Sequence, residues 1–437
     1  MPLRPEDVFT PNDFPVHTYV QRADKKLEDS LTFALGTPKT VISVSGPSKA
    51  GKTVLIERVV GSDNLITISG AVIGSASDLW DRVLDWIGVP DAVSKTVTDT
   101  GGYQIGAEGG GKAGIPFVVE GQAKATIQGQ QSKAEGVSRT ATRQGLAQVE
   151  REIAGSDFVV FVDDFHYIPR NSQTEVARQV KAAAGLGIKL CLAAVPHRAD
   201  DAVRSNSELR GRTSGIDVGF WTLEELAEIA TRGFATLGYT ITDVDAQRLA
   251  IEACRSPQLM QQICLQACRV MGIREGRAAD SPLTLSPLSF SAEATREALE
   301  MAASQTDYTS LVKTLHAGPK KRGMERKIFE FVDGSKGDVY RAILLALSAD
   351  PPVSEITYND LTKRIDRVCA GDEKPGMGSV VQSARHMSTL ARASLPEERI
   401  IEWEHDANMG LLSISDPYLL FFLRSSTKLT QLGNEPQ

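Results

Sequence analysis

The order of elements is decided by residues 40–53, TVISVSGPSKAGKT. The apolar, β-branched run between Pro38 and Gly46 predicts a buried strand. The next eight residues match the pattern G-x-x-x-x-G-K-[ST], and residues 53–60 that follow have helical character. A strand, a glycine-containing loop and a helix in this order form the local frame of a phosphate-binding loop.

Each residue type in this loop suits an anionic ligand. The glycines let backbone N–H groups turn inward around phosphate oxygens, and the helix that begins near Lys52 points its positive end at the same anion. Lys52 supplies a mobile charge for the β- and γ-phosphates, which makes it a candidate catalytic residue, and Thr53 offers a hydroxyl ligand to Mg²⁺. The predicted nucleotide contacts are Gly46, Pro47, Ser48, Lys49, Ala50, Gly51, Lys52 and Thr53.

A second motif, FVVFVDD at residues 158–164, supplies acidic partners for the loop. A hydrophobic strand that ends in an acid places that acid at the carboxyl edge of a parallel sheet, beside the phosphates. We expect Asp163 to hold Mg²⁺ through water and Asp164 to polarise the attacking water. Many ATPases carry glutamate in place of Asp164, and the shorter side chain leaves the hydrolysis rate open.

Composition narrows the class of protein. The 437 residues carry 48 Lys and Arg against 55 Asp and Glu, a net charge of −7, which argues against a protein that coats nucleic acid by bulk charge. The five cysteines form no C-x-x-C pair and are predicted to be buried thiols. The N-terminal MPLRPEDVF lacks the apolar region of a signal peptide, and the longest apolar runs are too short to span a bilayer. We therefore expect a reduced, cytoplasmic protein with no membrane partner.

The pattern along the chain predicts an α/β fold with several domains. Buried strands at residues 65–68, 158–162 and 189–195 alternate with helical segments, which is typical of a parallel sheet covered by helices. The predicted parts are a P-loop core (1–215) with an inserted glycine-rich hairpin region (about 90–148), a helical lid (216–302), a basic connector (303–334), a winged-helix domain (335–427) with the order helix–helix–helix–hairpin, and a tail (428–437).

With these motifs the chain resembles the AAA+ P-loop ATPases, and among them the origin-recognition/initiator-like and STAND-like groups. The resemblance covers roughly residues 16–275 and rests on TYVQR at 18–22, the phosphate loop, VDDFHYI at 162–168 and RSPQ at 255–258. It implies a sheet core with a helical lid and a C-terminal winged helix. Gln258 stands where initiator relatives often place a sensor arginine, and Arg255 stands where relatives carry glycine.

The resemblance also implies further site residues. Adenine contacts are expected from Tyr19, Val20, Arg22 and Pro257, although Tyr19 and Val20 could equally be packing residues. An arginine that reaches the γ-phosphate of a neighbouring subunit is expected at Arg210 or Arg212, with a solvated loop arginine as the alternative. The best candidate for a sensor at the end of the fourth strand is His197.

Two functions follow as hypotheses. The first is an ATP- and Mg²⁺-dependent switch that hydrolyses ATP, forms a homo-oligomer and acts on double-stranded DNA or a separate effector protein, in antiphage defence or a mobile element. The second is a DNA-binding or protein-bridging adaptor in which ATP is only structural. The third helix of the C-terminal domain offers contacts, but residues 335–437 carry eleven basic against fourteen acidic side chains, which fits a protein partner as well as DNA. The candidate contacts are Gln382, Arg385, His386, Thr389 and Arg392.

Overall fold

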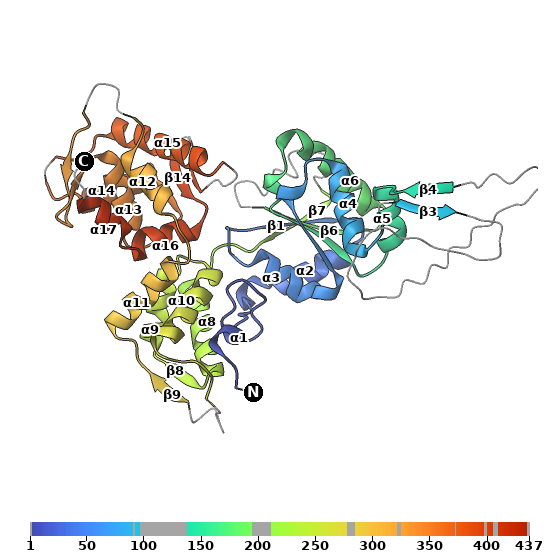
Figure 1. Ribbon diagram of the computed structural model, residues 1–437, viewed down its shortest axis with the longest axis horizontal. Coiled ribbons are helices and arrows are strands. Elements are labelled where there is room, and N and C mark those ends of the chain that lie inside the picture. The colour runs from blue at the N-terminus through green and yellow to red at the C-terminus, as the bar shows by residue number, and fades with distance from the viewer. Residues whose placement is uncertain are drawn as a thin grey trace, which may run out of the picture. The chain divides into compact units, whose positions relative to one another are not determined.

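The computed structural model describes residues 2–90, 92–96, 138–194, 211–277, 285–320, 325–371, 373–396, 400–404 and 410–434. The chain divides into two units, whose elements are drawn in Figure 1. One unit comprises residues 31–44 and 59–215 and holds most of the sheet. The other comprises residues 1–30, 45–58 and 216–437 and holds the phosphate loop and the helical C-terminal part of the chain.

A five-stranded sheet with the order β2-β5-β6-β1-β7 forms the core of the first unit. Strands β2, β5 and β6 are parallel, with Leu65 opposite Val159 and Val160 opposite Leu190. The strands predicted from apolar runs of the sequence are confirmed, with bounds that agree to within a residue or two. Apolar runs of this kind are typical of strands in a sheet that is covered on both faces. The strands are β1 (Val41–Ser45), β2 (Leu65–Ser69), β5 (Val159–Asp163), β6 (Lys189–Ala194) and β7 (Thr213–Asp217).

Three helices lie beside the sheet (Figure 1): α4 (Ala76–Ile87), α5 (Leu146–Ile153) and α6 (Arg170–Gly185). Trp80 and Val83 of α4 are buried in one apolar cluster with Val160 and Val162 of β5. Helix α4 begins at Ala76, because Ser75 accepts a hydrogen bond from the Asp78 amide and caps the helix.

The ends of the predicted insertion pair with each other. Strand β3 (Ala92–Thr96) is antiparallel to β4 (Ser138–Thr142), with Ala92 opposite Thr142. Residues 97–137, which form the rest of the predicted glycine-rich hairpin region, lie outside the described residues.

In the second unit, a helical bundle contains the predicted lid and the N-terminal segment. Phe9 is fully buried against Gly233, where a Cβ would lie 2.2 Å from the ring, and Thr18 accepts a hydrogen bond from the Gln261 amide at 2.5 Å. The first 30 residues therefore group with the lid helices rather than with the sheet, unlike the predicted 1–215 core. The elements are α1 (Pro5–Val8), α8 (Leu223–Thr236), α9 (Asp243–Glu252), α10 (Pro257–Val270), α11 (Ala292–Ala303) and the parallel pair β8 (Tyr239–Ile241) and β9 (Ser286–Leu288).

The C-terminal part has the predicted order of three helices and a hairpin. A short strand, β12, which the sequence did not indicate, joins the hairpin to form a sheet with the order β12-β14-β13. The elements are α13 (Val339–Ser348), β12 (Glu355–Thr357), α14 (Tyr358–Val368), α15 (Met377–Ser394), β13 (Ile401–Glu404), β14 (Leu411–Ile414), α16 (Pro417–Ser425) and α17 (Lys428–Asn434).

Two predicted segments are corrected. The basic connector at 303–334 contains helix α12 (Thr309–Ala317), whose Leu311 and Leu315 are buried, and strand β10 (Phe329–Glu330), which pairs with β11 (Lys336–Gly337). Within its basic cluster, Arg326 is bonded to Asp338, while Lys321 and Arg322 lie outside the described residues. The tail at 428–437 begins as α17, which buries Leu429 and Leu432.

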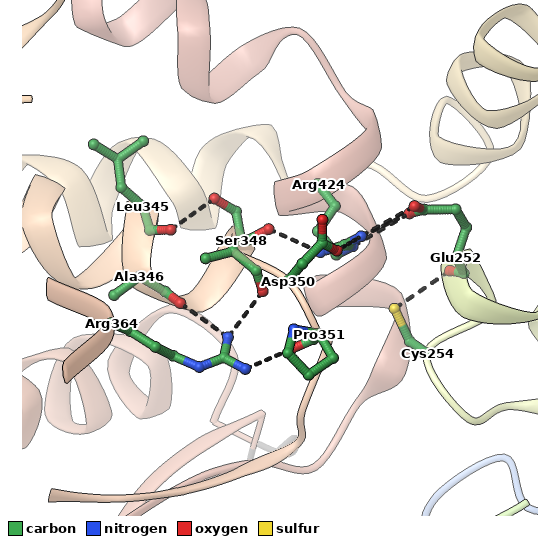
Figure 2. A network of polar contacts seen from close by, with 10 residues as sticks. Glu252, Cys254, Leu345, Ala346, Ser348, Asp350, Pro351, Arg364 and Arg424 are labelled. Carbon is green, nitrogen blue, oxygen red and sulfur yellow. Dashed lines mark hydrogen bonds and ion pairs between the residues drawn. The ribbon is translucent and has the colours of Figure 1, made fainter. Parts of the chain in front are cut away.

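A polar network joins lid helix α9 to helix α16 (Figure 2). The guanidinium of Arg424 donates to both carboxylate oxygens of Glu252, at 3.0–3.2 Å, to the Ser348 carbonyl at 2.9 Å and to Asp350 at 2.7 Å. The Arg424 side chain is 7% exposed. Beside it, Arg364 donates to the Ala349 carbonyl at 2.8 Å and so closes the end of α13.

All five cysteines are free and buried, which confirms their assignment as structural thiols. None of the helices in the described residues combines the length and the apolar character needed to span a lipid bilayer.

Candidate functional site

The segment between β1 and helix α3 (Lys52–Val60) has the backbone of a phosphate loop. Lys49 and Gly51 lie in the left-handed region, with φ of 61° and 89°, and such backbone turns N–H groups toward one side of the chain. A side chain at Gly46 would bring its Cβ to 3.0 Å from the Val218 Cβ, so this position also favours glycine. The fold is α/β, of the P-loop type.

The Lys52 ammonium lies against the loop itself. Its Nζ donates to the Gly46 carbonyl at 3.1 Å and to the Pro47 carbonyl at 2.9 Å, and the residue is only 6% exposed. Because Lys52 is also the first residue of α3, a positive side chain and the positive end of a helix coincide at this point. The loop therefore presents concentrated positive charge to a ligand.

Two residues of the lid segments donate hydrogen bonds to carbonyl groups of the loop. The Trp221 indole Nε1 donates to the Ala50 carbonyl at 2.9 Å, and the Ser256 hydroxyl donates to the Lys49 carbonyl at 3.4 Å. Ser256 also caps α10 by accepting from the Leu259 amide, and Pro257 follows it as the first residue of that helix. Sequence reasoning missed Trp221, whose one signal was its place directly before the helix-capping sequence Thr222–Glu225.

The predicted adenine contacts at the N-terminal segment have protein partners. The Tyr19 hydroxyl donates to Glu28 at 2.6 Å, and the Arg58 guanidinium lies 5.3 Å from the Tyr19 ring centre. Burial, and then the hydrogen bond to Glu28, raise the pKa of Tyr19 far above its ordinary value, so the hydroxyl stays protonated. Val20 is buried in the apolar cluster of the lid helices, and its contact with adenine stays a prediction.

Arg22 connects the N-terminal segment to the start of the lid through hydrogen bonds. It donates to Glu225 at 2.8 Å, to the Val218 carbonyl at 2.5 Å and to the Phe220 carbonyl at 2.6 Å. Its guanidinium also lies 5.0 Å from the Trp221 ring centre. Buried as it is, Arg22 positions backbone around the site, and a role in holding adenine stays a prediction.

In the sheet unit, Asp163 ends β5 and Asp164 follows it with a left-handed backbone, φ 52° and ψ 46°. The Asp163 carboxylate accepts the Asp164 amide at 2.9 Å. The Asp164 side chain is 43% exposed and lies 4.0 Å from the His166 ring. Gly70, which the sequence did not single out, fits against this turn, because a Cβ there would lie 2.3 Å from the Asp164 carbonyl oxygen.

The remaining predicted residues are placed as follows. The Arg212 carbonyl accepts the Val41 amide at 3.0 Å while its side chain is exposed, and Arg210 and His197 lie outside the described residues. On α15, four of the five predicted contacts are exposed at helical spacing: Gln382, Arg385, Thr389 and Arg392. The fifth, His386, shares a 2.9 Å hydrogen bond with the Tyr340 hydroxyl.

No protein-family model and no curated protein matches the sequence. Solved structures with a similar fold include Cdc6p from Pyrobaculum aerophilum, 13% identical over 98% of this chain and 99% of that chain, with a TM-score of 0.41. The ORC2 protein of Aeropyrum pernix is 12% identical over 97% and 98%, with a TM-score of 0.43. A Walker-type ATPase of Pyrococcus abyssi is 12% identical over 97% and 98%, with a TM-score of 0.45. These likenesses are too distant to assign a function.

Proposed function

We propose that this protein is an AAA+-type switch that binds ATP with Mg²⁺ and hydrolyses it. The observation that carries the proposal is the buried Lys52 ammonium, held by the loop carbonyls of Gly46 and Pro47 at the first turn of a helix. A phosphate chain replaces these two carbonyl acceptors, which carry only partial charge, with anionic oxygens, so that the Lys52 ammonium pairs with full negative charge.

Other residues of the predicted site have the chemistry needed for the Mg²⁺ ion, the attacking water and the adenine base. Thr53 and Asp163 offer hard oxygen ligands, the kind that Mg²⁺ prefers, and the ion, when bound, neutralises charge on the β- and γ-phosphates. Asp164 orients the attacking water, and its carboxylate is accessible for this because the side chain is 43% exposed. Tyr19, Val20, Arg22 and Pro257 form the adenine end.

Assembly and a partner are part of the same proposal. The exposed Arg212, or Arg210, supplies a positive charge to the γ-phosphate of a neighbouring copy. The exposed row on α15 contacts double-stranded DNA or a separate effector protein. The oligomer and the partner are supported by exposure and residue type, and the net negative charge of residues 335–437 keeps both partner classes in the proposal.

The test compares ATP binding and steady-state phosphate release, with and without double-stranded DNA, in wild type, Lys52→Ala and Asp164→Asn. Lys313→Ala, which removes an exposed lysine of α12, is the matched control. We expect Lys52→Ala to abolish binding, and Asp164→Asn to bind ATP but to lose turnover. Tight ATP binding by Lys52→Ala would contradict the proposal.

A specific observation favours a second function, the adaptor with structurally bound ATP. Asp164 is short and its backbone is fixed by the close approach of Gly70, so the carboxylate has little freedom to follow a water molecule. Bound ATP without turnover in the wild type would support the adaptor. Turnover that DNA stimulates would support the switch and assign the partner.

A further inference from the structure

We propose that Trp221 is a positioning residue for the phosphate loop, which it holds so that the Gly51 amide faces the phosphates. The proposal rests on the function proposed above and deepens it. It concerns a residue that lies outside the loop motif and directly before lid helix α8.

The geometry starts from one hydrogen bond. Trp221 Nε1 donates to the Ala50 carbonyl at 2.9 Å. A trans peptide is planar, so the Ala50 carbonyl and the Gly51 N–H, which share one peptide group, point in opposite directions. When the indole holds the Ala50 carbonyl, the Gly51 N–H therefore points away from Trp221, directly before Lys52, the first residue of α3.

The loop needs this restraint because of its own flexibility. Gly51 has φ of 89°, a conformation that glycine reaches easily and leaves as easily. Rotation of the peptide between Ala50 and Gly51 would direct a carbonyl oxygen toward the phosphates, which carry negative charge. The second lid contact, from Ser256 to the Lys49 carbonyl, is longer at 3.4 Å and restrains the preceding peptide group.

Trp221 is itself held firmly. The Arg22 guanidinium lies 5.0 Å from its ring centre and is fixed by Glu225 and by the carbonyls of Val218 and Phe220. The second oxygen of Glu225 accepts the Thr222 amide at 2.8 Å in the capping box of α8. The indole is therefore attached to the first turn of the lid, and the lid segment sets the orientation of a phosphate ligand.

The test uses Trp221→Phe in the full chain, because phenylalanine offers Arg22 a smaller aromatic ring and removes the indole donor. The matched control is Trp403→Phe: the buried indole nitrogen of Trp403 has no hydrogen-bond partner among the described residues. The affinities for ATP, ADP and adenosine are measured by calorimetry, with the melting temperature of the ligand-free protein as the fold check.

We expect Trp221→Phe to bind ATP and ADP about tenfold more weakly, the size of one hydrogen bond to a charged group, with adenosine affinity and melting temperature unchanged. Trp403→Phe should bind all three ligands as the wild type does. Equal ATP affinity in Trp221→Phe and wild type, or an equal loss for adenosine, would overturn the positioning role. If Trp221→Phe melts lower, Trp221→Tyr repeats the comparison, because its hydroxyl lies away from the indole nitrogen position. A wild-type protein that binds no nucleotide would instead overturn the proposed function.

Discussion

Two acidic residues share the guanidinium of Arg424, and their different exposure predicts that they contribute unequally to stability. The Glu252 side chain is 22% exposed, and the Asp350 side chain is 80% exposed. Arg424 itself is nearly buried, so a partner that is removed leaves its charge poorly solvated. We predict that Glu252→Gln destabilises the contact between α9 and α16 by about 2–3 kcal/mol, and that Asp350→Asn costs less than about 1 kcal/mol.

The magnitude follows from the geometry of the pair. Breaking a fully buried ion pair by removing one partner costs about 3–5 kcal/mol, and an exposed pair is worth about 0.2–1 kcal/mol. Glu252 accepts hydrogen bonds from two nitrogens of Arg424 at 3.0–3.2 Å, which is the bidentate arrangement. Because Glu252 is also partly open to water, the stability lost on its replacement lies between these two limits. Burial acts to lower the pKa of Arg424, but the hydrogen bonds and charges of Glu252 and Asp350 outweigh it, and the pKa is raised.

The assay is native-state hydrogen exchange on the full-length protein, followed in peptides that cover α9 and α16, because local opening can be resolved there without a two-state assumption. The stability lost in Asp350→Asn should become still smaller at high salt, whereas the stability lost in Glu252→Gln should persist. Equal costs for the two substitutions, or a larger cost for Asp350→Asn, would refute the reasoning from burial.

Three further predictions concern packing, thiols and pH. Gly233→Ala should cost about 1–3 kcal/mol in thermal unfolding because its Cβ would lie 2.2 Å from the Phe9 ring, whereas Gly36→Ala, with no atom within 4 Å of the added Cβ, should not lower the melting temperature. The five buried cysteines, with burial raising the pKa of Cys191 to about 12, should react with a thiol reagent only after denaturation; fast labelling of the native protein would contradict the burial. Burial raises the pKa of Asp333, but hydrogen bonds from Ser335 and the charge of Arg341 outweigh it and hold the pKa below 3.8. The stabilisation is therefore present above about pH 4 and is lost as the pH falls through the folded-state value, so Asp333→Asn should lower the melting temperature at pH 7 and lower it progressively less as the pH falls below about 4.

The strands and the phosphate loop could be predicted from the sequence because each depends on the residue types within a short segment. The runs at 41–45 and 159–163 lie inside the sheet and bury most of their residues, so apolar residues dominate both, and the loop requires glycine and lysine at fixed positions. Helix α12 escaped prediction because it is short, with three buried apolar residues, Leu311, Val312 and Leu315, and its stability comes from packing in the C-terminal core.

Only the tertiary structure decided which distant residues meet. Nothing in the local sequence joins Trp221 to Ala50 or Glu252 to Arg424, since each contact links segments about 170 residues apart. The grouping of the N-terminal segment with the lid likewise depends on Phe9 fitting against Gly233. The sequence by itself determined the phosphate loop, whose function depends on backbone conformation within eight residues. The partners that hold the loop and join the domains were decided by long-range packing, which a local pattern does not encode.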